Sequence, residues 1–169
     1  MAAVDDPREV SRTFFVDGPV GTGKTTLYGC LIWSLRHRPQ PLEMMCVAYT
    51  GIAASLMDGG MTVHSTFGLP FGTLTEDSTS TVTMQSERAR KIRNAALIVW
   101  DEAPMSPGLQ LTVVDRLLMG CHGVGGKTML FAGDFRQILP VVRRGTRVDI
   151  VMSSIKENGL WSVMERFNL

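Results

Sequence analysis

The stretch Gly18-Pro-Val-Gly-Thr-Gly-Lys-Thr25 has the pattern G-x-x-x-x-G-K-T, which is the signature of a phosphate-binding loop. Residues 13–16 before it are strand-like, and residues 26–35 after it have the apolar spacing of a helix. The glycines therefore lie where a strand turns into a helix, so the backbone can approach phosphate oxygens closely. This context distinguishes the stretch from a Gly-rich turn that matches by chance.

The loop predicts which atoms hold a nucleotide and its metal ion. Lys24 is expected to reach the β- and γ-phosphates of ATP, which makes it a catalytic residue as well, and the Thr25 hydroxyl is expected to ligate Mg²⁺. The N-terminus of the following helix adds its dipole to the same anion. The predicted ATP-binding residues are Gly18, Pro19, Val20, Gly21, Thr22, Gly23, Lys24, Thr25 and Thr26.

The composition is that of a single globular domain. Of 169 residues, 44% are apolar and 20% charged, and the net charge of +1 neither indicates nor excludes a nucleic-acid partner. Three cysteines lie far apart without a C-x-x-C pair, which favours reduced thiols over disulfides or zinc. The sequence shows neither a signal peptide nor an apolar run that would span a membrane. We therefore expect no membrane partner and a nuclear or other intracellular location, with mitochondria left open.

The rest of the chain alternates between apolar runs and amphipathic segments. Further strands are predicted at 43–50, 97–100 and 128–132, and helices at 51–57, 86–94 and 109–119. An irregular segment is predicted at 61–71, a loop at 72–83 and a turn at 120–126. This alternation predicts an α/β fold of the P-loop NTPase type, in which helices flank a mostly parallel central sheet. The predicted division is a polar N-terminal lead at 1–12 and one folded lobe at 13–169.

Two carboxylates follow the strand predicted at 97–100. Asp101, at the end of a buried strand near the loop, is placed to hold Mg²⁺ directly or through water. Glu102 is then placed to orient and polarise the attacking water as general base. An Asp-Glu pair alone often only ends a strand, but this pair follows four apolar residues and a phosphate-binding loop.

Gln137 follows the strand predicted at 128–132, within the segment Gly133-Asp-Phe-Arg-Gln137. Ligands of open α/β sheets bind at the carboxyl ends of the strands. Gln137 is therefore a candidate catalytic residue that senses the γ-phosphate or the attacking water. The alternative is a surface amide, and the residues alone do not decide between the two.

Four segments follow the loop in order: Thr50-Gly-Ile-Ala-Ala54, Gly59-Gly-Met-Thr-Val-His-Ser-Thr-Phe67, Trp100-Asp-Glu-Ala-Pro-Met105 and Gly133-Asp-Phe-Arg-Gln-Ile-Leu-Pro-Val-Val142. They resemble the petite-integration-frequency (Pif-one) DNA helicases of superfamily one, especially those associated with Helitron-type transposons. The resemblance covers nearly the whole chain. It implies a RecA-like lobe that uses ATP and Mg²⁺, DNA unwinding with 5′-to-3′ movement, and roles in repair, recombination and telomere or transposon maintenance.

By position, the resemblance places single-stranded DNA near Thr50, Gly51, His64 and Phe67. Phe67 would stack on a base, which contributes about 1–3 kcal/mol in single-strand binders. The alternatives are that Phe67 is a core residue and that His64 only ties down a loop. The resemblance also implies DNA duplex junctions as substrates.

Two groups of basic residues are candidates for contacts with the DNA backbone. They are Arg88, Arg90, Lys91 and Arg93 in the helix predicted at 86–94, and Arg143, Arg144 and Arg147 further along the chain. For the first group we favour a solvated helix face.

Two departures from the family pattern narrow the expected activity. Residues 1–17 contain no Gln that would read adenine, which leaves base selectivity open. We also expect the second RecA-like lobe and its arginine finger to be absent, and such an arginine is worth about 10³–10⁵ in rate. The expected protein is an ATPase lobe that hydrolyses ATP slowly by itself. The alternative is a nucleotide-dependent module that binds single-stranded DNA without turnover, whereas the order of elements argues against a small kinase.

Overall fold

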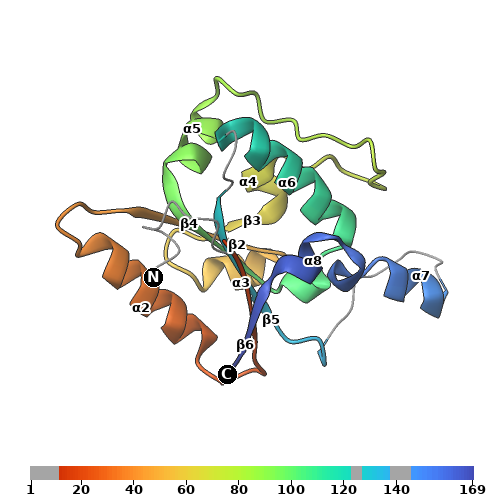
Figure 1. Cartoon of the computed structure of the whole chain (residues 1–169), viewed down its shortest axis with the longest axis horizontal. Coiled ribbons are helices and arrows are strands. Elements are labelled where there is room, and N and C mark those ends of the chain that lie inside the picture. Colours follow the sequence, from red (N-terminus) through yellow and green to blue (C-terminus); the bar gives the residue numbers. More distant parts are fainter. Residues whose placement is uncertain (1–11, 123–126, 138–145) are drawn as a thin grey trace.

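Six parallel strands form one sheet in the residues that the computed structural model describes, 12–122, 127–137 and 146–169 (Figure 1). The strand order is β3-β2-β4-β5-β1-β6, and every pairing between these strands is parallel. The strands are β1 (Thr13–Asp17), β2 (Glu43–Ala48), β3 (Met61–Thr62), β4 (Ala95–Asp101), β5 (Thr128–Gly133) and β6 (Glu165–Asn168). Because the strands are parallel, their carboxyl ends meet at one edge of the sheet.

Helices cover both faces of this sheet (Figure 1). One face packs against α2 (Lys24–Arg36) and α3 (Gly51–Ser55), and the other against α4 (Val63–Phe67), α5 (Glu87–Asn94) and α6 (Gly108–His122). The shorter elements are η1 (Ala103–Met105), α7 (Arg147–Met152), η2 (Ile155–Glu157) and α8 (Leu160–Val163). The predicted α/β fold with a mostly parallel central sheet is confirmed.

The central strands are buried on both of their sides. Trp100 and Phe131 point to the face covered by α4, α5 and α6, and their rings lie 5.5 Å apart. Their neighbours Val99 and Leu130 point to the face covered by α2 and α3. This two-sided burial explains why β4 and β5 are unbroken apolar runs rather than alternating ones.

The predicted strands and the helices predicted at 51–57, 86–94 and 109–119 are present with shifted ends. Residues 72–83 form neither helix nor strand, as predicted. The turn predicted at 120–126 is wrong for residues 120–122, because α6 continues to His122, and 123–126 lie outside the described residues. The predicted lead at 1–12 also lies outside them except for Arg12.

The prediction of an irregular segment at 61–71 is wrong for residues 61–67, which form β3 and α4. The Thr62 hydroxyl caps α4 by accepting from the Ser65 amide at 3.2 Å, and Gly68 ends the helix at φ 56°. Helix α7 and strand β6 were not predicted from the sequence. In the described ranges, no helix is long and apolar enough to cross a membrane.

Candidate functional site

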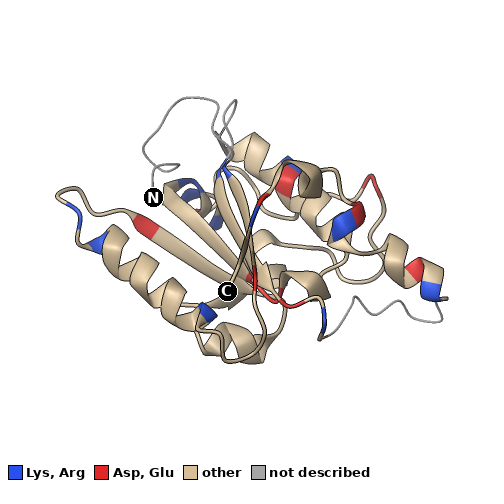
Figure 2. Ribbon diagram, turned by 60° about the horizontal axis from the view of Figure 1, so that its bottom comes forward, with Lys and Arg blue, Asp and Glu red and all other residues tan. Residues whose placement is uncertain are grey.

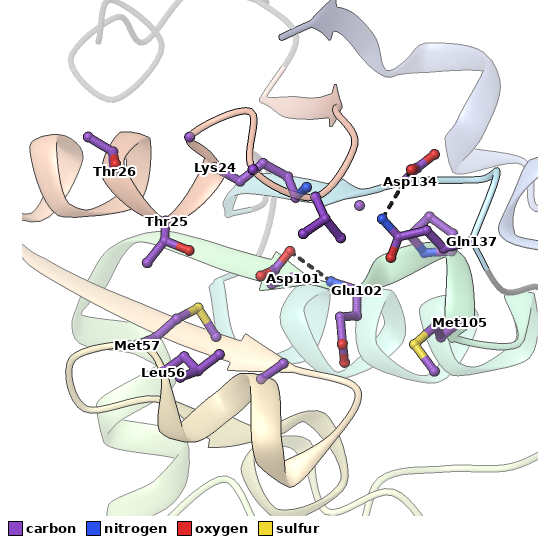
Figure 3. Close-up of a pocket in the computed structure, with 16 residues that line it drawn as sticks. Lys24, Thr25, Thr26, Leu56, Met57, Asp101, Glu102, Met105, Asp134 and Gln137 are labelled. Carbon is purple, nitrogen blue, oxygen red and sulfur yellow. Dashed lines mark hydrogen bonds between the residues drawn. The ribbon is translucent and has the colours of Figure 1, made fainter.

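The carboxyl ends of β1, β4 and β5 surround a cavity of about 540 Å³ (Figure 3). Leu56 and Met57, which follow α3, line another side of it. The predicted nucleotide, metal and catalytic residues that line this cavity are Val20, Gly21, Gly23, Lys24, Thr25, Thr26, Asp101, Glu102 and Gln137. Gly18, Pro19 and Thr22 belong to the same loop but are not among its lining residues. The fold thus gathers side chains from three separate motifs into one site.

The backbone of the phosphate-binding loop needs its glycines. Gly21 and Gly23 have φ values of 85° and 93°, in the left-handed region that glycine occupies without steric cost. The Gly18 amide donates to the Gly133 carbonyl at 3.1 Å, which ties the loop to the end of β5. No side chain caps α2, and its first turn holds no acidic residue, so its first amides remain available to an anion.

Lys24 lies along the inside of the loop. Its ammonium donates to the carbonyl of Gly18 at 2.5 Å and to that of Pro19 at 2.9 Å. The Thr22 hydroxyl donates to the same Pro19 carbonyl at 2.9 Å. These bonds hold the one cation of the loop against its own backbone, on the side that lines the cavity. Thr25 is exposed at the same opening.

Asp101 is held by a tyrosine that sequence reasoning missed. The Tyr28 hydroxyl donates to Asp101 Oδ1 at 3.0 Å, and the Glu102 amide donates to the same oxygen at 2.9 Å. Burial raises the pKa of Asp101, although these two bonds favour its charged form. Burial and the nearby carboxylate raise the pKa of Tyr28, which keeps its hydroxyl protonated as a donor. The spacing in the sequence could have identified Tyr28, because it lies four residues after Lys24 and therefore on the same helix face.

Glu102 has an unusual backbone and a specific partner. It is the only non-glycine residue with positive φ in the described part of the chain, at φ 54° and ψ 30°. Its Oε2 accepts from the Thr50 hydroxyl at 2.7 Å and from the Thr50 amide at 3.2 Å. In Figure 3 the Glu102 carboxylate points toward α3 and away from Lys24. The structure therefore links the predicted base to a residue predicted to contact DNA.

Gln137 is exposed at the rim of the cavity, where its amide donates to Asp134 Oδ2 at 3.1 Å. Arg136 donates to Asp134 Oδ1 at 2.9 Å, and this interaction lowers the pKa of Asp134. Arg136 also forms an ion pair with Asp17 at 3.8 Å. Gln137 therefore lies beside the site, with its side-chain amide bonded to Asp134.

The residues present fit a magnesium ion. Thr25 and Asp101 offer the hard oxygen ligands that Mg²⁺ prefers, and substrate phosphates and waters commonly complete such a shell. Both described hydrogen bonds to the Asp101 carboxylate use Oδ1, so no described donor occupies Oδ2. The described ranges contain no group of three or more His, Cys, Asp or Glu side chains that would hold a metal without a substrate.

The four residues predicted to contact DNA differ in their exposure to solvent. Thr50 and His64 are half-buried and Gly51 is exposed, so all three are accessible. Phe67 is 0% exposed and its ring lies 5.9 Å from that of Trp100 in the core. The prediction that Phe67 stacks on a base is therefore wrong for this fold, and Phe67 is a core residue.

Phe71 is an accessible aromatic residue that sequence reasoning missed. Its side chain is 97% exposed, and its ring lies parallel to that of His64, at 6.5 Å and 11°. The ring of Tyr49 lies edge-on to the His64 ring, at 6.3 Å. The sequence did contain a signal for Phe71, because it lies between Pro70 and Gly72, where a loop rather than a core element is expected.

Among the described residues, Lys and Arg are spread over several elements and do not form one stripe (Figure 2). On α5, Arg90 and Lys91 pair with Glu87 at 3.9 and 3.5 Å, and Arg93 donates to the Met84 carbonyl. This agrees with the solvated helix face that we favoured for this group. Arg143 and Arg144 lie outside the described residues, and Arg147 begins α7.

Comparisons with known proteins place the chain in a family. The model of the PIF1-like helicase family matches residues 3–169. The ATP-dependent DNA helicase Pif1 of Bdellovibrio bacteriovorus is 32% identical over 168 residues, which are 96% of this chain and 36% of that protein. The PIF1 helicase of Candida albicans is 32% identical over 149 residues, which are 82% of this chain and 16% of that protein. The chain thus spans about a third or less of these relatives.

Solved structures give the same relationship. Bacteroides Pif1 bound to single-stranded DNA superimposes with a TM-score of 0.77 at 26% identity, over 93% of this chain and 38% of that one. Bacteroides Pif1 in complex with ADP-AlF3 and single-stranded DNA also gives a TM-score of 0.77, over 95% of this chain and 39% of that one. The fold is therefore RecA-like, as predicted, and the chain belongs to the PIF1-like helicase family.

Proposed function

We propose that this chain is the ATP-binding and ATP-hydrolysing lobe of a DNA helicase that moves 5′ to 3′ along a single strand. The observation that carries the proposal is the convergence of Lys24, Asp101, Glu102 and Gln137 on one cavity at the carboxyl edge of the sheet. The relatives named as ATP-dependent DNA helicases support it, as does the nucleotide analogue in the Bacteroides Pif1 complex.

The proposed reaction is hydrolysis of the γ-phosphate. The oxygen of a water molecule bonds to the γ-phosphorus, the bond to the β–γ bridging oxygen breaks, and ADP leaves with that electron pair. Glu102 accepts the proton of the attacking water, while Lys24 and the loop amides neutralise charge on the phosphate oxygens. Gln137 reports the γ-phosphate or orients the water. Thr25 and Asp101 would hold Mg²⁺, which supplies positive charge to the phosphates.

Single-stranded DNA is the proposed polymer partner. Thr50, Gly51 and His64 offer accessible polar atoms at one end of the sheet, and Phe71 adds an exposed ring beside His64. A stacked aromatic residue and a few backbone contacts are the usual means of holding a single strand without reading its sequence. Phe71 therefore replaces Phe67 as the proposed stacking residue.

This assignment predicts opposite effects for two phenylalanines. Phe71→Ala should weaken the binding of a single-stranded oligonucleotide by about 1–3 kcal/mol and leave stability unchanged, because the ring is exposed. Phe67→Ala should instead lower the free energy of unfolding by about 3–5 kcal/mol, because it empties a core position. Fluorescence anisotropy and urea denaturation measure the two effects. Unchanged oligonucleotide affinity in Phe71→Ala would contradict its role.

A second RecA-like lobe is proposed to complete the site, because the matched residues make up only 36% and 16% of these relatives. Such a lobe would supply an arginine finger, so this lobe by itself would turn over slowly. Three further proposals rest on the family alone. They are DNA duplex junctions as substrates, roles in repair, recombination and telomere or transposon maintenance, and a nuclear, mitochondrial or other intracellular location.

Mg-ATP binding and steady-state hydrolysis, with and without oligothymidylate, test the proposed function. We expect binding with slow turnover by this chain, and faster DNA-stimulated turnover when a matching second lobe is fused to it. Absence of Mg-ATP binding would contradict the proposal. A fused protein that binds Mg-ATP but never hydrolyses it would favour the alternative, a binding module without turnover.

A further inference from the structure

The two donors of Thr50 converge on one oxygen of the proposed base. Its hydroxyl lies 2.7 Å from Glu102 Oε2 and its amide 3.2 Å from the same atom. A hydrogen bond from a hydroxyl to a carboxylate of this length belongs to the strong, charge-assisted class. Glu102 is therefore held at Oε2 by two bonds from a residue 52 positions away in the chain.

The sheet enforces this contact. Strands β2 and β4 are neighbours in register, with Ala48 opposite Asp101, and the Tyr49 amide continues the ladder to the Asp101 carbonyl at 3.4 Å. Thr50 and Glu102 are the next polar residues beyond this point. The left-handed backbone of Glu102 turns its carboxylate toward α3 and away from Lys24 (Figure 3).

The Thr50 hydroxyl has a fixed direction. It accepts from the Ala53 amide at 3.2 Å and so caps α3, which leaves its single proton for Glu102. A general base acts through a lone pair that accepts the proton of the attacking water within hydrogen-bond reach. The two bonds from Thr50 to Oε2 instead hold the whole carboxylate on the side of α3, away from Lys24 (Figure 3).

We propose that Thr50 is a positioning residue that restrains Glu102 until single-stranded DNA binds beside it. A DNA phosphate has acceptor oxygens only, so a phosphate bound at Thr50 would take the hydroxyl and amide donors that now serve Glu102. The two states exclude each other, and DNA binding thereby frees the base for hydrolysis. This inference rests on the proposed function and names the regulation of the same site.

Thr50→Val tests the restraint, because it keeps the β-branched shape and removes the hydroxyl. We expect kcat for ATP hydrolysis without DNA to rise at least about fivefold, the lower end of usual coupling between sites, with KM for ATP unchanged. Added oligothymidylate should then stimulate Thr50→Val by a smaller factor than the wild type. A purely structural role would lower kcat or stability and would not raise the DNA-free rate.

Two control variants isolate the hydroxyl bond to Glu102. Thr50→Ser keeps a donor and a helix cap, so its DNA-free rate should stay well below that of Thr50→Val. Thr62→Val removes the equivalent cap of α4, which does not involve Glu102, and should leave the DNA-free rate unchanged. A Thr50→Val rate that is unchanged or lower overturns this inference alone, whereas a wild-type chain that fails to bind Mg-ATP overturns the proposed function.

Discussion

Lys24→Ala should reduce the affinity for Mg-ATP by at least about 100-fold, because the variant loses the only ammonium in the loop. Hydrogen bonds to charged groups contribute about 1.5–3 kcal/mol each, and a lysine of this motif reaches two phosphates. The loss would be visible in a titration with a fluorescent ATP analogue. Thermal unfolding should be measured as well, since Lys24 also bonds to the loop carbonyls of Gly18 and Pro19.

Lys91→Ala is the matched control for this change. Lys91 is exposed on α5, and its described ion pair is with Glu87 at 3.5 Å, far along the chain from the loop. It should bind Mg-ATP as the wild type does. If Lys24→Ala kept wild-type affinity while remaining folded, the cavity at the ends of β1, β4 and β5 would not be the nucleotide site.

Glu102→Gln should lose turnover and keep Mg-ATP binding. General-base catalysis contributes about 10²–10⁴ in rate, and an amide has no basic lone pair to take the proton of water. The amide oxygen can still accept from the Thr50 hydroxyl and amide, so the local structure should persist. Single-turnover hydrolysis and a binding titration on the same sample separate the two properties.

Glu157→Gln makes the same chemical change at an exposed position of η2. Its rate should equal that of the wild type. Loss of Mg-ATP binding in Glu102→Gln would assign Glu102 a structural role, and retained turnover would assign the base to another residue.

The sequence predicts the part of the fold that local patterns encode. Strands β4 and β5 are unbroken apolar runs, and each ends in the polar residues that form the site, so both strands and Asp101 and Glu102 were identifiable. Helix α4 had local signals as well, in the capping hydroxyl of Thr62 and the left-handed Gly68. Those signals were outweighed by the glycines and polar residues around them, which favour irregular structure.

Other features depend on residues that are distant in the chain. Strand β6 is exposed along its length and becomes a strand only by pairing with β1. The bond between Thr50 and Glu102 requires the register of β2 against β4, which no local pattern specifies. The burial of Phe67 similarly depends on Trp100, so the same aromatic residue fits a core position and a DNA contact in sequence alone.

The left-handed backbone of Glu102 costs stability, whereas its carboxylate is needed for the proposed hydrolysis. Only glycine and, to a lesser degree, asparagine or aspartate adopt this conformation readily, and other residues there carry strain of about 1–3 kcal/mol. Backbone preference alone would favour Gly, Asn or Asp at this position: Gly and Asn lack a carboxylate, and the carboxylate of Asp is one methylene closer to the backbone. Directed evolution that selects for heat tolerance without selecting for turnover would therefore favour replacement of the glutamate at position 102.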